Sequence, residues 1–192
     1  MEKSGSRSAI IKSVVLVVLG AVIILGIYFL FTRNKKSDKE ENYQLTVVDE
    51  ITTTNLQKNY PADARMVVEF YGKIMRTLYR ETYTEEQQMK MLDVLAGIMD
   101  DELMANQPGF YQSMRSEVAQ RKKEDYSIVA YVVQNAEPNV VKVDGSKMCN
   151  IDCLFSLRHS TVTTASYYQF IMRQDDEGKW KILGWVVKQD EN

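Results

Sequence analysis

Two cysteines four residues apart are the side chains best suited, by type and spacing, to metal or redox chemistry. Cys149 and Cys153 occur in KMCNIDCLFSL, where apolar residues take alternate positions. This alternation predicts a strand with both thiols on one buried face. Along a strand they lie about 13 Å apart, whereas a disulfide needs α-carbons within about 7 Å. We therefore predict two free, buried thiols. A metal site is the alternative, but this pair and a single histidine supply little more than half a site.

Four other side chains are candidates for acid or base chemistry: Asp152, His159, Tyr167 and Tyr168. Asp152 falls on the strand face opposite the thiols, and His159 falls at the tip of a predicted hairpin. A general base needs surroundings that shift its pKa, and a hairpin tip offers little burial. Tyr167 and Tyr168 are adjacent and point to opposite faces, so at most one of them lines a pocket. We predict no catalytic residue.

Longer motifs for catalysis or cofactor binding are absent from the sequence. It contains no G-x-S-x-G elbow, no phosphate-binding loop and no dinucleotide fingerprint. Two acidic clusters, at 100–102 and 175–177, lack the alternating oxygen ligands of a calcium loop. Helix capping and turn formation explain both clusters. We predict no cofactor and no metal ion.

The first part of the predicted domain consists of helices. Apolar residues recur at helical spacing over 62–81, and Thr84 begins a capping box for a second helix. Asp100 and Asp101 are predicted to cap a short helical piece, DELMANQ. Pro108 lies near the start of a last helix, whose end carries the basic run 121–123.

The second part of the predicted domain consists of strands. Five segments after residue 125 are rich in β-branched and aromatic residues: YSIVAYVVQN, NVVKV, KMCNIDCLFSLR, TTASYYQFIMRQ and KWKILGWVVK. Turn signals lie between them, including Asp144-Gly145, 159–161 and 175–178. We predict an α+β domain over 61–188, with three to four helices packed on one face of a curved antiparallel sheet.

An uncharged run near the amino terminus predicts a transmembrane helix. Residues 13–32 read SVVLVVLGAVIILGIYFLFT, and twenty residues at about 1.5 Å each span the hydrocarbon core of a bilayer. The run is too long for a cleaved signal and is followed by Arg33, without a small-x-small site. We predict an uncleaved, single-pass anchor in the cell membrane. The basic tip, 1–12, is expected in the cytoplasm and the long domain outside it.

Charge separates the rest of the chain from the basic flanks of this span. Residues 37–192 contain 18 Lys and Arg against 25 Asp and Glu, a net charge of −7. An acidic domain does not attract phosphate backbones, which disfavours nucleic-acid binding. The polar, threonine-rich segment 33–60 is predicted to be a linker. Packing of 45–51 on the domain as a short extended segment is the alternative.

The order of helices followed by a bent meander ending in KWKILGW resembles the nuclear transport factor 2-like, or cystatin-like, cone superfamily. More closely, NYPADARMVVEFY, LYRE, DDELMANQP and KWKILGW resemble an uncharacterised family of single-pass membrane proteins from anaerobic Firmicutes. Single-span proteins with such a cone include assembly components of conjugation and secretion machines. The resemblance implies a cone-like fold and assigns no activity.

Two hypotheses about function follow. In the first, a non-catalytic interaction or assembly module outside the cytoplasm binds a protein partner, or itself, through its sheet. In the second, the cone binds a small apolar ligand or is an isomerase- or dehydratase-type enzyme. A cavity plugged by large aromatic residues favours the first, and an open cavity with an ionisable group favours the second. The residues expected in a pocket or on a sheet face are Phe155, Tyr167, Tyr168, Phe170, Trp180 and Trp185.

Overall fold

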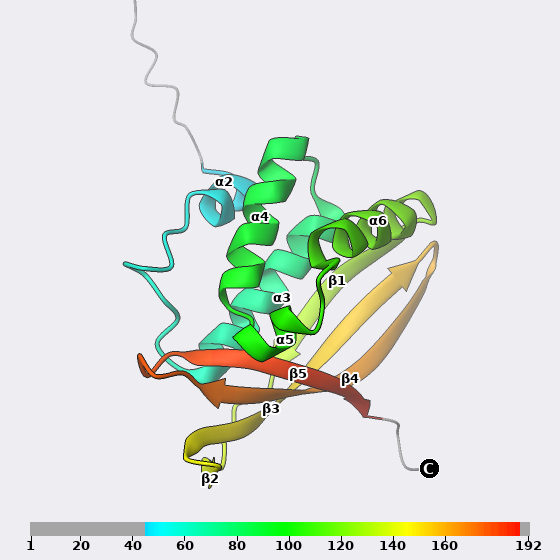
Figure 1. The fold of residues 1–192 in the computed structure, drawn as a ribbon. Coiled ribbons are helices and arrows are strands. Elements are labelled where there is room, and N and C mark those ends of the chain that lie inside the picture. The colour runs from blue at the N-terminus through cyan, green and yellow to red at the C-terminus, as the bar shows by residue number, and fades with distance from the viewer. Residues whose placement is uncertain (1–44, 189–192) are drawn as a thin grey trace, which may run out of the picture. The chain divides into compact units, whose positions relative to one another are not determined.

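The computed structural model describes residues 45–188, in which a layer of helices covers one face of an antiparallel sheet (Figure 1). The helices come first in the chain and the strands follow, as the sequence predicts for an α+β domain. The elements are α2 (Val47–Thr52), α3 (Ala64–Arg80), α4 (Glu85–Gly97), α5 (Asp101–Ala105), α6 (Phe110–Lys123), β1 (Tyr126–Val133), β2 (Val141–Val143), β3 (Ser146–His159), β4 (Val162–Gln174) and β5 (Trp180–Lys188).

The helix boundaries are set by side chains that accept hydrogen bonds from free backbone N–H groups. Thr84 and Gln87 form the predicted capping box at the start of α4, and Asp100 accepts a hydrogen bond from Glu102 N at the start of α5. Asp63 caps α3 in the same way, through Met66 N. The predictions at Thr84 and Asp100 are confirmed.

The sheet has the strand order β1-β3-β4-β5, and β2 pairs with the first residues of β3. All these pairings are antiparallel. The turns that join β2 to β3, β3 to β4 and β4 to β5 contain Asp144, Gly145, Ser160 and Gly178, which have positive φ. Every one of these turns lies at a predicted turn signal. The predicted hairpin positions are therefore confirmed.

The outer edge of β5 is partly closed by the corner between α4 and α5. Ile182 N donates a hydrogen bond to Ile98 O at 3.0 Å, and Asp100 N donates to Ile182 O at 2.9 Å. These bonds place the helical layer directly beside the sheet edge.

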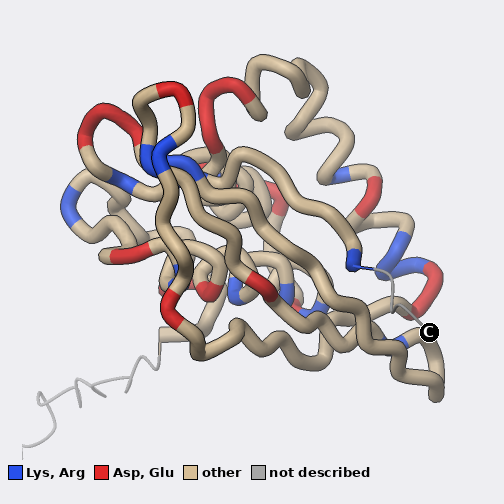
Figure 2. Tube along the Cα trace, turned by 90° about the horizontal axis from the view of Figure 1, so that it is seen from below, with Lys and Arg blue, Asp and Glu red and all other residues tan. Residues whose placement is uncertain are grey.

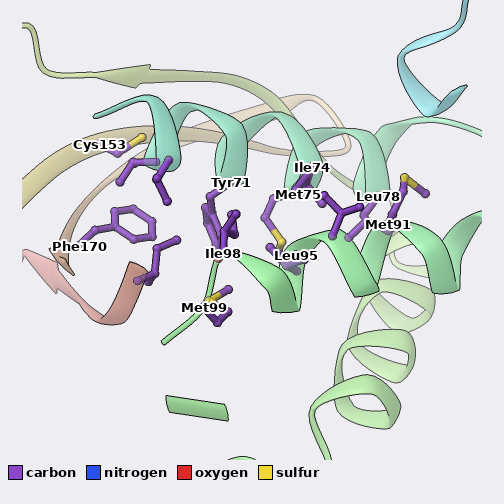
Figure 3. Packing of buried hydrophobic residues seen from close by; sticks show 14 of the residues in the cluster. Tyr71, Ile74, Met75, Leu78, Met91, Leu95, Ile98, Met99, Cys153 and Phe170 are labelled. Atoms are coloured by element: carbon purple, nitrogen blue, oxygen red, sulfur yellow. The ribbon is translucent and has the colours of Figure 1, made fainter. Parts of the chain in front are cut away.

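Helix α3 is the centre of the hydrophobic core. Its side chains Ile74, Met75 and Leu78 lie between α3 and α4, and together with Tyr71 they contribute to one continuous cluster of buried residues (Figure 3). Cys149 and Cys153 are buried on the helix-facing side of β3 and are both free. The prediction for the two thiols is thus confirmed.

The segment 45–60 does not form the predicted linker. Residues 47–52 form helix α2, which has a capping box between Thr46 and Asp49 and buries Val48 and Ile51. Burial of these two side chains attaches α2 to the domain, so the compact unit begins at Leu45 instead of Pro61. The alternative, packing of this segment on the domain, was right in location, but the segment is helical instead of extended.

Within residues 45–188, no helix is both long enough and apolar enough to cross a bilayer. The predicted cytoplasmic tip, the predicted span at 13–32 and the first part of the predicted linker lie outside the described residues.

Candidate functional site

The structure separates the six aromatic residues expected in a pocket or on a sheet face. Phe155, Tyr168, Phe170 and Trp185 point toward the helices, whereas Tyr167 points to the opposite face and Trp180 lies near the other end of β5. Trp180 is half-buried, and its backbone carbonyl accepts a hydrogen bond from the hydroxyl of Tyr60 at 2.8 Å. The prediction that only one tyrosine of the pair lines a pocket agrees with this geometry.

Three of the four helix-facing aromatic residues contact a fifth ring, which the sequence analysis did not place in the pocket. The ring centroid of Tyr71 on α3 lies 5.0 Å from that of Phe170, 5.9 Å from Trp185 and 6.2 Å from Phe155. A tyrosine in a helical stripe is indistinguishable by spacing from an ordinary core residue. Only the fold brings it against the sheet.

These rings line a cavity of about 400 Å³ between the helical layer and the sheet. Its walls come from α3, α4, α6 and all four long strands. Their apolar part includes Met75, Leu95, Met114, Phe155 and Phe170. The large aromatic residues therefore form a wall and do not plug the space. An open cavity with an ionisable group such as Glu117 in its lining is the feature expected for small-ligand binding.

Polar groups enter this apolar cavity from α3 and α6. The hydroxyl of Tyr79 donates a hydrogen bond to Glu117 Oε1 at 3.1 Å. Burial raises the pKa of Tyr79 and of Tyr71 above the ordinary value, and the Glu117 carboxylate raises both further. Both hydroxyls therefore remain protonated at neutral pH and act as hydrogen-bond donors.

Asp152 and His159, the two acid-base candidates, lie away from the cavity and away from each other. Asp152 accepts hydrogen bonds from Gln169 Nε2 at 2.9 Å and from Lys188 Nζ at 2.6 Å. The His159 ring stacks on Tyr126 at the hairpin end of the sheet, with ring centroids 4.2 Å apart. Each has a structural partner, and the structure does not bring the two together.

The face of the sheet opposite the helices is largely uncharged and carries exposed apolar side chains. Val132, Leu154 and Tyr167 lie in one row across β1, β3 and β4, and Val186 lies nearby on β5. Val132 is 59% exposed, Tyr167 41% and Val186 50%. Figure 2 shows that charged residues are sparse along the middle of the strands. We call this surface the outer face.

The two acidic clusters have structural roles in the fold. Asp100 caps α5 and is held by Arg173, while Asp175 accepts hydrogen bonds from Glu177 N and Lys179 N within its turn. Capping and turn formation are as predicted, but the ion pair with Arg173 was missed. In the described part of the chain, no group of three His, Cys, Asp or Glu side chains is placed to hold a metal ion.

The chain belongs to the family described as a domain of unknown function, DUF6715, whose model matches residues 1–185. This match includes both the predicted membrane span and the domain. The comparison with curated proteins finds no match.

Two solved structures have a partly similar fold. One is an IcmL-like type IV secretion system protein from Legionella pneumophila, with 12% identity, a TM-score of 0.39, and 66% of this chain and 92% of that chain covered. The other is the intermembrane space region of the chloroplast protein ARC6, with 14% identity, a TM-score of 0.34, and 70% and 96% covered.

Proposed function

We propose that this member of the DUF6715 family is a membrane-anchored module outside the cytoplasm that binds a protein partner through the outer face of its sheet, without catalysis of its own. The anchor is the apolar run at 13–32, and the binding module is the domain that begins at Leu45. A cone-like arrangement of helices on a curved sheet is part of this proposal. The observation that carries it is the apolar outer face, which no helix of residues 45–188 covers.

The apolar character of the outer face supports docking of a protein. An antiparallel sheet that borders water on one face normally places polar residues there. Here Val132, Tyr167 and Val186 are exposed together, and the helices lie on the opposite side (Figure 1). Exposed apolar patches of this kind mark interaction surfaces.

The detailed chemistry of the outer face suits a protein partner. Tyr167 supplies an amphipathic ring of the type that dominates binding energy at interfaces. The small residues Ala130 and Ala165 flank Ser156 in the next row and keep that part of the surface flat. Asp152 and Lys188 neutralise each other in an ion pair, so the face does not need a strongly charged partner.

Site-directed photo-crosslinking in intact cells tests this proposal. A photoreactive amino acid at Val132 should give a discrete crosslinked product, and one at Met66, which is exposed on α3, should not. The mass of the product distinguishes a partner from a second copy of the chain. Crosslinking from Met66 with none from Val132 would place the binding surface on the helices and refute the proposal.

A matched pair of substitutions tests the role of Tyr167. Tyr167→Asp should abolish the crosslink from Val132, because it removes the aromatic ring and places a charge in the apolar row. Tyr111→Asp is the control, since Tyr111 on α6 is 36% exposed and Tyr167 is 41% exposed. Asp152→Ala and His159→Ala should leave the biological role intact. Loss of that role in these two variants, with Tyr167→Asp still active, would contradict a non-catalytic outer-face module.

Protease protection tests the proposed location. Protease added to intact cells or spheroplasts should remove the domain, because the long acidic domain is expected to be translocated. Protection until lysis would place the domain in the cytoplasm.

A further inference from the structure

The cavity on the helix-facing side of the sheet has the size and shelter of a small-molecule site. Its volume of about 400 Å³ falls in the range of about 300 to 1,000 Å³ that is typical of ligand pockets. It lies on the face of the sheet opposite Tyr167. It can therefore be tested separately from the proposed docking surface.

The walls of the cavity are fixed by the core of the domain. Tyr71, Phe155 and Phe170 are buried, and the ring of Tyr71 packs edge-on against the other two. Met75 and Leu95 come from α3 and α4, the helices at the centre of the core. A cavity with such walls is largely pre-formed, so a ligand does not have to order them on binding.

One hydrogen-bond donor in the cavity is unused by the protein. Tyr71 lines the cavity, and its hydroxyl forms no hydrogen bond within residues 45–188 and is open to the cavity space. The neighbouring hydroxyl of Tyr79 is already bonded to Glu117. An acceptor that enters the cavity would satisfy the Tyr71 hydroxyl.

The charges around the cavity balance. Glu117 and Arg121 lie one turn apart on α6 and both line it. The guanidinium of Arg121 lies over the ring of Tyr126, 5.0 Å from its centroid. One charge of each sign gives no net preference for an anion or a cation.

We infer that this cavity binds a compact, neutral, mainly apolar molecule that carries a hydrogen-bond acceptor such as a carbonyl, which accepts a hydrogen bond from Tyr71. The apolar walls contact the body of the ligand, and the hydroxyl fixes its orientation.

Benzophenone is a suitable probe, because it is a neutral diaryl ketone that inserts into nearby C–H bonds on illumination. With the full chain in detergent, we expect adducts on the lining residues Met75, Met99 and Met114. Met66 is the internal control, because it is exposed and outside the cavity. Labelling of Met66 equal to that of the lining residues, or no labelling of the lining residues, would overturn the inference.

A pair of substitutions on adjacent residues tests occupancy. Ser166→Phe places a ring in the cavity and should abolish labelling of Met75 and Met114, whereas Ala165→Phe on the outer face should not. Labelling that persists in folded Ser166→Phe would overturn the inference.

Tyr71→Phe removes the hydroxyl without changing the ring packing. It tests ligand binding through Tyr71 even if Ser166→Phe does not fold. The benzophenone concentration for half-maximal labelling should rise about two- to tenfold, the effect of one neutral hydrogen bond. Diphenylmethane lacks the carbonyl and should therefore reduce the photolabelling of the wild-type protein only weakly. In Tyr71→Phe it should occupy the cavity as well as benzophenone does. Equal competition by the two compounds in the wild type would refute the role of Tyr71.

Discussion

The guanidinium of Arg173 on β4 holds both carboxylate oxygens of Asp100, the residue that caps α5. Its Nε donates to Asp100 Oδ2 at 2.9 Å, and a further donor reaches Glu102 at 2.8 Å. The Asp100 side chain is 6% exposed and that of Arg173 28% exposed. One side chain of the sheet thus fixes the corner of the helical layer.

Arg173→Met should therefore destabilise the domain, because it leaves the Asp100 carboxylate buried without its cation. We expect a loss of about 2 to 4 kcal/mol of unfolding free energy in urea, below the full cost of a buried pair because Arg173 is partly exposed.

Lys188→Met is the control, because it removes the cation of the more exposed pair with Asp152. Its cost should stay below about 1 kcal/mol. Equal losses in the two variants would mean that burial of Asp100 adds nothing to the Arg173 pair.

Two helical glycines should respond in opposite ways to alanine. A Cβ at Gly72 would lie 2.6 Å from a ring carbon of Tyr131, whereas one at Gly97 would lie 2.5 Å from Cδ1 at the far end of the flexible Leu56 side chain, which can shift. Gly72→Ala should cost about 1 to 3 kcal/mol through overpacking. Gly97→Ala should be neutral or stabilising by up to about 1 kcal/mol, the helix-propensity gain. Thermal unfolding of the two variants measures the difference, and a stabilised Gly72→Ala would show that Tyr131 moves freely.

Attachment of α2 changes where a stable fragment should begin. A fragment of residues 45–192 should unfold cooperatively, because it contains the whole compact unit. A fragment that begins at 61 should be less stable, because it exposes the surface that Val48 and Ile51 cover.

Ile51→Ala in the longer fragment provides the graded version of this test. Ile51 is fully buried, and its truncation should cost about 2 to 4 kcal/mol. Circular dichroism in urea is the measurement. Equal stability of the fragments that begin at 45 and at 61 would mean that residues 45–60 act only as a linker.

The two thiols should react only when the protein unfolds. Burial raises the pKa of Cys149 to about 11 and that of Cys153 to about 12. Both remain thiols at neutral pH, and the thiolate is the reactive form. A thiol reagent should therefore label the native protein slowly and the denatured protein at once. Ser116→Cys on the exposed side of α6 is the control and should label immediately.

The same shifts predict the dependence of stability on alkaline pH. A thiol whose pKa is higher in the folded state contributes stability below the pKa of the unfolded chain. That contribution is lost as pH rises from about 9 through 12. Unfolding free energy should fall over this range, with a smaller slope in Cys153→Ala. If the unfolding free energy of Cys153→Ala falls with pH as steeply as that of the wild type, the buried tyrosines and not the thiol cause the loss of stability.

Local features of the fold were predictable because their signals lie within a few residues of one another. Thr84 and Gln87 form a capping box three residues apart. Asp144 and Gly145 both have positive φ in their turn, a backbone conformation that few other residue types adopt. The alternation around Cys153 likewise predicted its buried face.

Features that depend on distant residues were not predictable. Arg173 and Asp100 are 73 residues apart, and neither has a local signal for the other. The role of Tyr71 in the cavity depends on the position of α3 over β3 and β4. Helix α2 was missed because its segment is mostly polar, and only Val48 and Ile51 reveal the buried side.

The two backbone bonds at Ile182 limit what the sheet can recruit at its edge. A foreign strand that approaches β5 finds the N–H and C=O of Ile182 already bonded to Ile98 and Asp100. On the carboxyl-terminal side of Ile182 it can pair only with the six residues from Leu183 to Lys188, so the open edge is shorter than the strand itself. Ile182 thereby interrupts the edge of the strand that carries the exposed Val186 and Val187, and a foreign strand that paired with all of β5 would have to displace these two bonds.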